Sequence, residues 1–114
     1  MAILTRKNIP IAGADVAAGF VAATVTTGDK VIPGPGVFVI VKNASGAPIT
    51  VAIDDPNTPT PPGYTAFNPD ATVTVAATTG QQAIAIPDRF AGADGMATLI
   101  CSAVTSVTLQ AFQV

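Results

Sequence analysis

Side chains that could perform chemistry are scarce in this chain of 114 residues. Histidine and glutamate are both absent, so the commonest catalytic base is missing. A serine, threonine or cysteine nucleophile needs a base within hydrogen-bond reach. The remaining candidates, Lys30 and Lys42, each lie beside a predicted turn, where a solvated ammonium is the ordinary state. The sequence therefore predicts that the protein is not an enzyme and has no catalytic residue.

The one cysteine, Cys101, shares a face of a predicted strand with Leu99. A thiol that points into an apolar core is inert, so we expect a structural role for it. A single cysteine cannot form an internal disulfide, which is consistent with synthesis in a reducing cytoplasm.

Metal and cofactor sites also lack the necessary ligands. Asp54 and Asp55 are the only adjacent acids, and with Asn57 they offer oxygen ligands for calcium. The spaced pattern of a calcium loop is missing, and neighbours at a strand end point to opposite sides. The turn Gly34-Pro35-Gly36 precedes a strand rather than joining a strand to a helix, so it does not fit a phosphate loop. We expect no metal, no cofactor and no small-molecule substrate.

Charge is equally scarce, at 11% of residues, with a net charge of −2. Five basic residues are scattered, which argues against nucleic acid and against a polybasic membrane anchor. The most apolar stretch, 31–41, is too short to cross a membrane and contains two prolines. An exterior of threonine, serine, asparagine, glutamine and alanine instead suits packing against another protein.

Hydrophobic residues alternate with period two along most of the chain, which is typical of half-buried strands. Seven strands are predicted, at 20–26, 37–41, 49–53, 72–75, 82–86, 97–102 and 107–110. The continuous apolar run from Val37 to Val41 predicts the central strand, covered on both faces. A helix is plausible only as a turn around 15–18. The fold class is all-β: a single small β-sandwich or barrel of about seven antiparallel strands with an extended N-terminal arm.

Two segments do not fit this strand pattern. Residues 1–19 have few turn signals and predict an extended arm that docks on a neighbour, leaving 20–114 as the sandwich domain. Residues 54–69 contain five prolines, which predicts a stiff surface loop with Tyr64 and Phe67 as apolar tips. The predicted assembly contacts are therefore Ile3, Leu4, Arg6, Ile9, Ile11, Tyr64 and Phe67.

Two connections carry local predictions. Arg89 could pair with Asp88 or Asp94, while Phe90 anchors this connection at the edge of the core. Asn43-Ala44-Ser45 matches a glycosylation sequon, but a hairpin loop explains both polar residues.

Several of these segments together resemble a known family. They are Val37-Phe38-Val39-Ile40-Val41-Lys42-Asn43 with Ser45-Gly46 and Ile49-Thr50-Val51, then Pro87-Asp88-Arg89-Phe90, Asp94-Gly95 and Ser102-Ala103-Val104-Thr105-Ser106-Val107-Thr108-Leu109. In pattern this chain resembles the small head decoration, or capsid cement, proteins of tailed bacteriophages, particularly those of actinobacterial phages. The likeness covers most of 36–114 and does not cover the arm.

The resemblance implies a β-sandwich that binds the outer surface of an assembled shell, commonly as a homotrimer, and clamps neighbouring major capsid proteins. The protein would then be made in the host cytoplasm and reside on the capsid surface of the virion. A glycan- or receptor-binding module of a phage tail or cell surface is the alternative, although the chain has no tryptophan and one tyrosine to form a sugar platform. A head-to-tail connector or tail-tube subunit would form rings instead of trimers.

Overall fold

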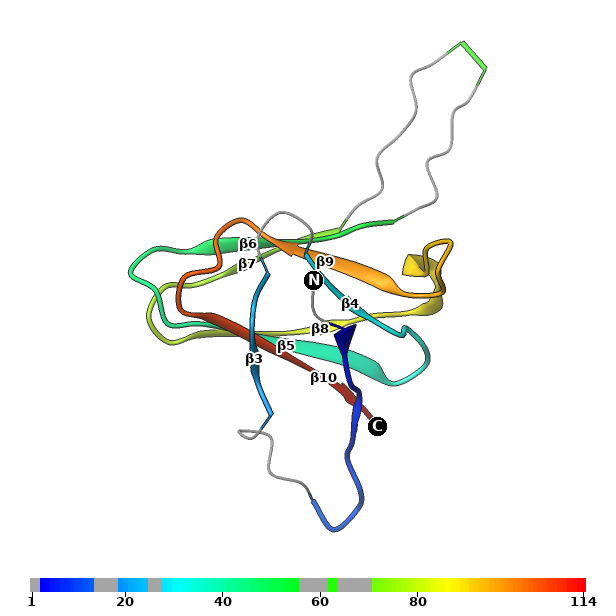
Figure 1. Cartoon of the computed structure of the whole chain (residues 1–114), viewed down its shortest axis with the longest axis horizontal. Coiled ribbons are helices and arrows are strands. Elements are labelled where there is room, and N and C mark those ends of the chain that lie inside the picture. The colour runs from blue at the N-terminus through cyan, green and yellow to red at the C-terminus, as the bar shows by residue number, and fades with distance from the viewer. Residues whose placement is uncertain (1–2, 14–18, 25–27, 56–61, 64–70) are drawn as a thin grey trace.

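The computed structural model describes residues 3–13, 19–24, 28–55, 62–63 and 71–114. They form a small β-sandwich of two mixed sheets, each with five strands (Figure 1). The first sheet has the order β1 (Ile3–Leu4), β4 (Asp29–Val31), β9 (Ala97–Cys101), β6 (Ile49–Ile53) and β7 (Ala71–Val75). The second has the order β2 (Lys7–Asn8), β10 (Val107–Gln113), β5 (Val37–Asn43) and β8 (Gly80–Ala85), and β3 (Val21–Ala22) also pairs with β10.

The predicted fold class is confirmed, and a strand occupies each of the seven predicted positions. Three short strands, β1, β2 and β4, were not predicted, because two or three residues carry no readable alternation. The expected antiparallel arrangement is also incomplete, since β1 pairs with β4 and β2 with β10 in parallel. Neither pair is joined by a hairpin, so no tight turn dictates its direction. The predicted turn at 15–18 lies outside the described residues.

The core lies between the two sheets and is built from every second residue of the long strands. In β5, Val37, Val39 and Val41 are buried against the opposite sheet, while Phe38 and Ile40 on the other face are half-buried. β5 is paired on both edges, with β10 and with β8, which confirms it as an inner strand. Its continuous apolar pattern therefore reflects partial cover on its outer face.

That outer cover comes from a second, smaller aromatic cluster. Phe112 points away from the main core yet is fully buried, with its ring stacked on Phe38 at a centroid distance of 5.4 Å. Phe20, just before β3, lies 6.3 Å from Phe112, and the Lys42 ammonium lies 4.0 Å from the Phe20 ring centroid. The N-terminal region thus covers part of the outer face of the second sheet.

The connection between β8 and β9 forms a short 3-10 helix at Asp88–Phe90. Phe90 is buried, which confirms it as the anchor, and the Arg89 guanidinium lies 4.5 Å from its ring centroid. Asp94 forms an ion pair with Lys30, which had not been predicted. The Lys30 hydrogen bond holds the pKa of the Asp94 carboxyl below its usual range.

Asn43 at the end of β5 is buried and has a structural role. Its amide donates to the carbonyls of Ala47, at 2.8 Å, and Ala76, at 3.1 Å. Its oxygen accepts from the backbone N–H of Ser45 at 3.0 Å. Asn43 thus joins its own hairpin to the β7–β8 turn, which supports the hairpin interpretation of the sequon.

Candidate assembly surface

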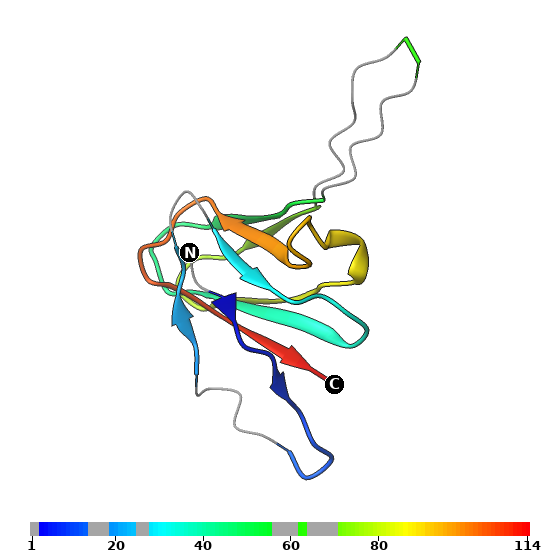
Figure 2. The same ribbon diagram turned by 45° about the vertical axis from the view of Figure 1, so that its right-hand side comes forward.

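The N-terminal segment crosses from one sheet to the other along one side of the sandwich (Figure 2). Ile3 and Leu4 pair with Lys30 and Val31 of the first sheet. Lys7 and Asn8 then pair with the end of β10 in the second sheet. This segment, residues 3–8, closes that side of the sandwich. We call the surface around it, together with β3 and Ile32, the arm side.

Alternation places Leu4 and Ile3 on opposite faces of β1. Leu4 is 6% exposed and belongs to the hydrophobic core, whereas Ile3 is 63% exposed. Of the predicted assembly contacts, Leu4 therefore packs inside its own chain, while Ile3 remains on the surface.

The other predicted contacts are spread over the molecule. Arg6 and Ile9 are half-buried on the arm side, and the Ile9 N–H donates to the Gln113 carbonyl at 3.0 Å. Ile11 is fully exposed on the turn that projects beyond the end of β10 (Figures 1 and 2). Tyr64 and Phe67 lie outside the described residues. The structure therefore brings Ile3 and Arg6 together and separates Ile11 from them.

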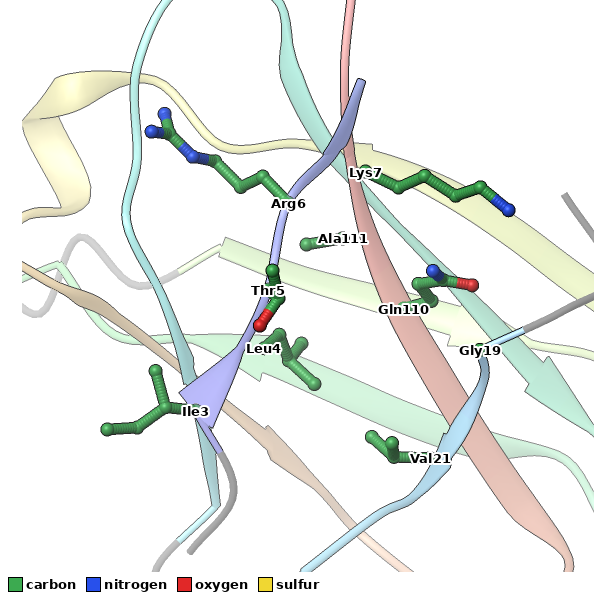
Figure 3. A pocket seen from close by; sticks show the side chains of 9 residues that line it. All are labelled: Ile3, Leu4, Thr5, Arg6, Lys7, Gly19, Val21, Gln110 and Ala111. Carbon is green, nitrogen blue, oxygen red and sulfur yellow. The ribbon is translucent and has the colours of Figure 1, made fainter. Parts of the chain in front are cut away.

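Two hollows flank residues 3–8. One has a volume of about 410 Å³ and is lined by residues that include Lys7, Val21 and Gln110 (Figure 3). The other, of about 320 Å³, includes Arg6 and Ile32, and Ile3 borders both. Val21, Ile32 and Gln110 were not predicted as contact residues, because nothing in the sequence places them near the arm.

The larger hollow lies over a gap in the outer edge of β10. There Leu109 pairs with Val21 and Phe112 with Lys7, which leaves Gln110 and Ala111 between two different strand partners. Gln110 is 9% exposed, and within the described part of the chain no group donates to its Oε1. A buried acceptor without a donor is unfavourable, so this oxygen could accept a hydrogen bond from a bound partner.

Gly19 supports this arrangement. Its φ is +90°, and a Cβ there would stand 2.7 Å from the Gln110 Nε2 atom. Only glycine adopts this conformation readily and allows the Gln110 amide so close to the backbone. The positive φ therefore favours glycine at this position beside Gln110.

Three of the side chains considered for chemistry have a structural contact or lie in the core: Lys30, Lys42 and Cys101. Lys30 donates to Asp94, and Lys42 lies over Phe20. Cys101 is buried, and burial raises the pKa of its thiol to about 11. Asp55 is buried and Asp54 exposed, while Asn57 lies outside the described residues. Across the described ranges, histidine, cysteine and acidic side chains form no group of three that could hold a metal ion.

The described residues contain no helix of the length and apolarity that crossing a membrane requires. No protein-family model, curated protein or solved structure matches this chain.

Proposed function

We propose that this chain is a structural virion protein, a decoration or cement subunit that binds the outer surface of a capsid through its arm side. The observation that carries the proposal is the composition of that surface. Ile3, Val21 and Ile32 are exposed there by 63%, 40% and 48%. Two of the five basic residues, Arg6 and Lys7, lie among them.

This surface has the chemistry of a protein contact. Exposed aliphatic side chains lose contact with water when a partner covers them, which contributes about 25 cal/mol per Å² of apolar area. A donor from the partner would also satisfy the Gln110 oxygen, which has no donor among the described residues. The neutral remainder of the exterior adds little repulsion between closely packed copies.

The partner in this proposal is the major capsid protein, and the family resemblance supports that choice. A decoration subunit is bound many times on one shell, and an assembled clamp gains strength because later contacts become intramolecular. Modest apolar patches therefore suffice. The homotrimer that the resemblance implies would form on the assembled shell, and no catalytic step is needed.

Co-sedimentation tests the proposal directly. The purified full chain is mixed with empty shells assembled from the major capsid protein of the virus that encodes it, and the bound fraction is measured. We expect the wild-type chain to sediment with the shells. Ile32→Asp should weaken binding at least tenfold, because it places a carboxylate in the contact.

Ile100→Asp is the matched control for this experiment. Ile100, on β9, is 39% exposed and lines neither of the two arm-side hollows. Its substitution should leave binding unchanged. A wild-type chain that stays unbound would contradict the function, and equal losses in both variants would contradict the arm side as the contact.

A further inference from the structure

The opposite side of the sandwich is formed by β7 and β8, the last strands of the two sheets. Strand β8 has a pairing partner on one edge only, β5. The direction of its backbone groups follows from neighbouring hydrogen bonds. The Val114 N–H donates to the Gly36 carbonyl, and the Ala44 N–H donates to the Ser106 carbonyl. The backbone N–H and C=O groups of even-numbered β5 residues therefore point towards β10. Odd-numbered positions therefore face β8.

The register of β5 and β8 then divides the β8 backbone. Gln82 and Ile84 stand opposite Val41 and Val39, so their N–H and C=O groups bond to β5. The backbone groups of Gln81, Ala83 and Ala85 point the other way. Among the described residues, no strand pairs with that outer edge.

This edge carries none of the usual protection against pairing. The β8 sequence, Gly-Gln-Gln-Ala-Ile-Ala, has no charged residue and no proline. Edge strands normally carry a lysine, a proline or a bulge that prevents another strand from adding to them. Gln82 is exposed although it shares a face with the buried Ile84, so the space beside the edge is open to solvent.

We propose that β8 pairs antiparallel with β8 of a second copy, about a two-fold axis through Ala83. In this register Ala83 faces Ala83 of the other copy, and Gln81 faces Ala85. All the outward N–H and C=O groups then find partners, and the second sheet continues from one copy into the next. The contact is self-complementary, as a two-fold interface must be.

Side chains and charges are compatible with this register. The outer face places alanine opposite alanine at the axis, so the strands can approach without a clash. Lys42 lies beside Gln81 on the neighbouring strand. Across the interface, Gln81 stands opposite Ala85 of the second copy, and the next residue along that line is Phe38 of the second copy. The two Lys42 ammonium groups therefore do not meet, and no like charges lie opposite each other.

Strand β8 is preferred over β7 because it offers the longer edge. The register of β6 with β7 and β9 leaves only Thr72 and Thr74 of β7 with outward backbone groups, against three residues on β8. Each outward residue supplies one donor and one acceptor, so pairing through β8 forms the longer ladder.

Sedimentation equilibrium of the full-length chain over a range of concentrations tests this inference. We expect a monomer–dimer equilibrium for the wild type. Ala83→Pro removes an N–H that points outward and that the chain's own sheet does not use. It should weaken dimerisation at least tenfold, while the circular dichroism spectrum stays unchanged.

Two further variants decide the outcome. Thr74→Pro removes an outward N–H from β7 and should leave dimerisation unchanged. Ala83→Lys places two cations opposite each other at the axis and should abolish the dimer, which keeps the test valid should Ala83→Pro fail to fold. The proposal would be overturned if the wild-type chain were still monomeric at about 1 mM, a concentration on the order of the dissociation constant of the weakest specific contacts. A dimer that Ala83→Lys leaves unaffected would overturn it as well. The chain alone is used, so failure here leaves capsid binding through the arm side untouched.

Discussion

The two sides of this sandwich differ in the length, cover and charge of the strands at their sheet edges. On the arm side, residues 3–8 pair with both sheets, so the ends of both sheets are two-residue strands. Arg6 and Lys7 add charge there. On the other side, β7 and β8 are five and six residues long and contain no charged side chain.

This difference shows how a chain with few charges can control its strand edges. Short edge strands and a crossing segment discourage edge-to-edge pairing without many charged residues. Among the residues that the structure describes, the β8 side has neither device. The two proposed contacts differ accordingly: side-chain contacts on the arm side, and backbone pairing on the β8 side.

The largest effect should come from breaking the cluster that joins the N-terminal region to the second sheet. Phe112→Ala removes a fully buried ring that contacts Phe20 and Phe38, so unfolding should become easier by about 3–4 kcal/mol. Urea titration measures the change. Phe38→Ala, at a half-buried position, is the control and should cost less. Equal costs would mean that the N-terminal region contributes little cover.

The next effect concerns the closure of the arm side itself. Leu4→Ala should reduce stability by about 2–3 kcal/mol, because Leu4 is the arm's contribution to the core. Ile3→Ala, one residue away and mostly exposed, should change stability by less than about 0.5 kcal/mol. Thermal and urea unfolding of the two variants would show this contrast. Similar losses in both variants would contradict the inward position of Leu4.

Gln110→Met tests the arm side further, because its expected effects on folding stability and on capsid binding differ. Methionine has a similar shape and removes the buried oxygen that has no donor among the described residues, so stability should be unchanged or rise by about 1 kcal/mol. Binding to capsid shells should nevertheless weaken. Gln82→Met on the open side should alter neither property. A marked loss of stability in Gln110→Met would indicate that the amide already has a partner.

A pH-dependent effect uses Cys101, in the first sheet, as an internal reporter. The pKa of its thiol is raised from 9.0 to about 11 by burial, so folding favours the protonated form. This contribution to stability is complete below pH 9 and is lost as the pH rises towards 11. Urea titrations at pH 8 and pH 11 should show a loss that Cys101→Ala lacks.

The rate of thiol modification then compares the two sides. Leu4→Ala should accelerate modification of Cys101 at pH 8, because it loosens the closed side of the core. Ala83→Pro should leave the modification rate unchanged, because the N–H that it removes points outward and is not used by the chain's own sheet. Acceleration in both variants would show that the β8 edge also protects the core.

Much of the candidate surface could not be predicted, and the reason differs among residues. Ile3 was predicted as a contact and is exposed, whereas Leu4 was predicted with it and is buried. A two-residue strand shows no period, so the sequence could not tell which side chain points inwards. Val21 and Ile32 were missed because they reach the arm side from segments that are distant in the sequence.

The sequence by itself determined seven of the ten described strands and much of the core. Alternation fixes which residues of a long strand share a face, so the inward positions of β6 and the burial of Cys101 could be predicted from spacing alone. The absence of histidine and the scarcity of charge likewise follow from composition.

Only the tertiary structure decided which strands pair, and in which direction. The parallel pairings of β1 and β2, the burial of Phe112 on an outer face and the gap at Gln110 all depend on where the N-terminal segment docks. Backbone hydrogen bonds are the same for every residue type except proline, so short edge strands are placed by the whole fold rather than by their own residues.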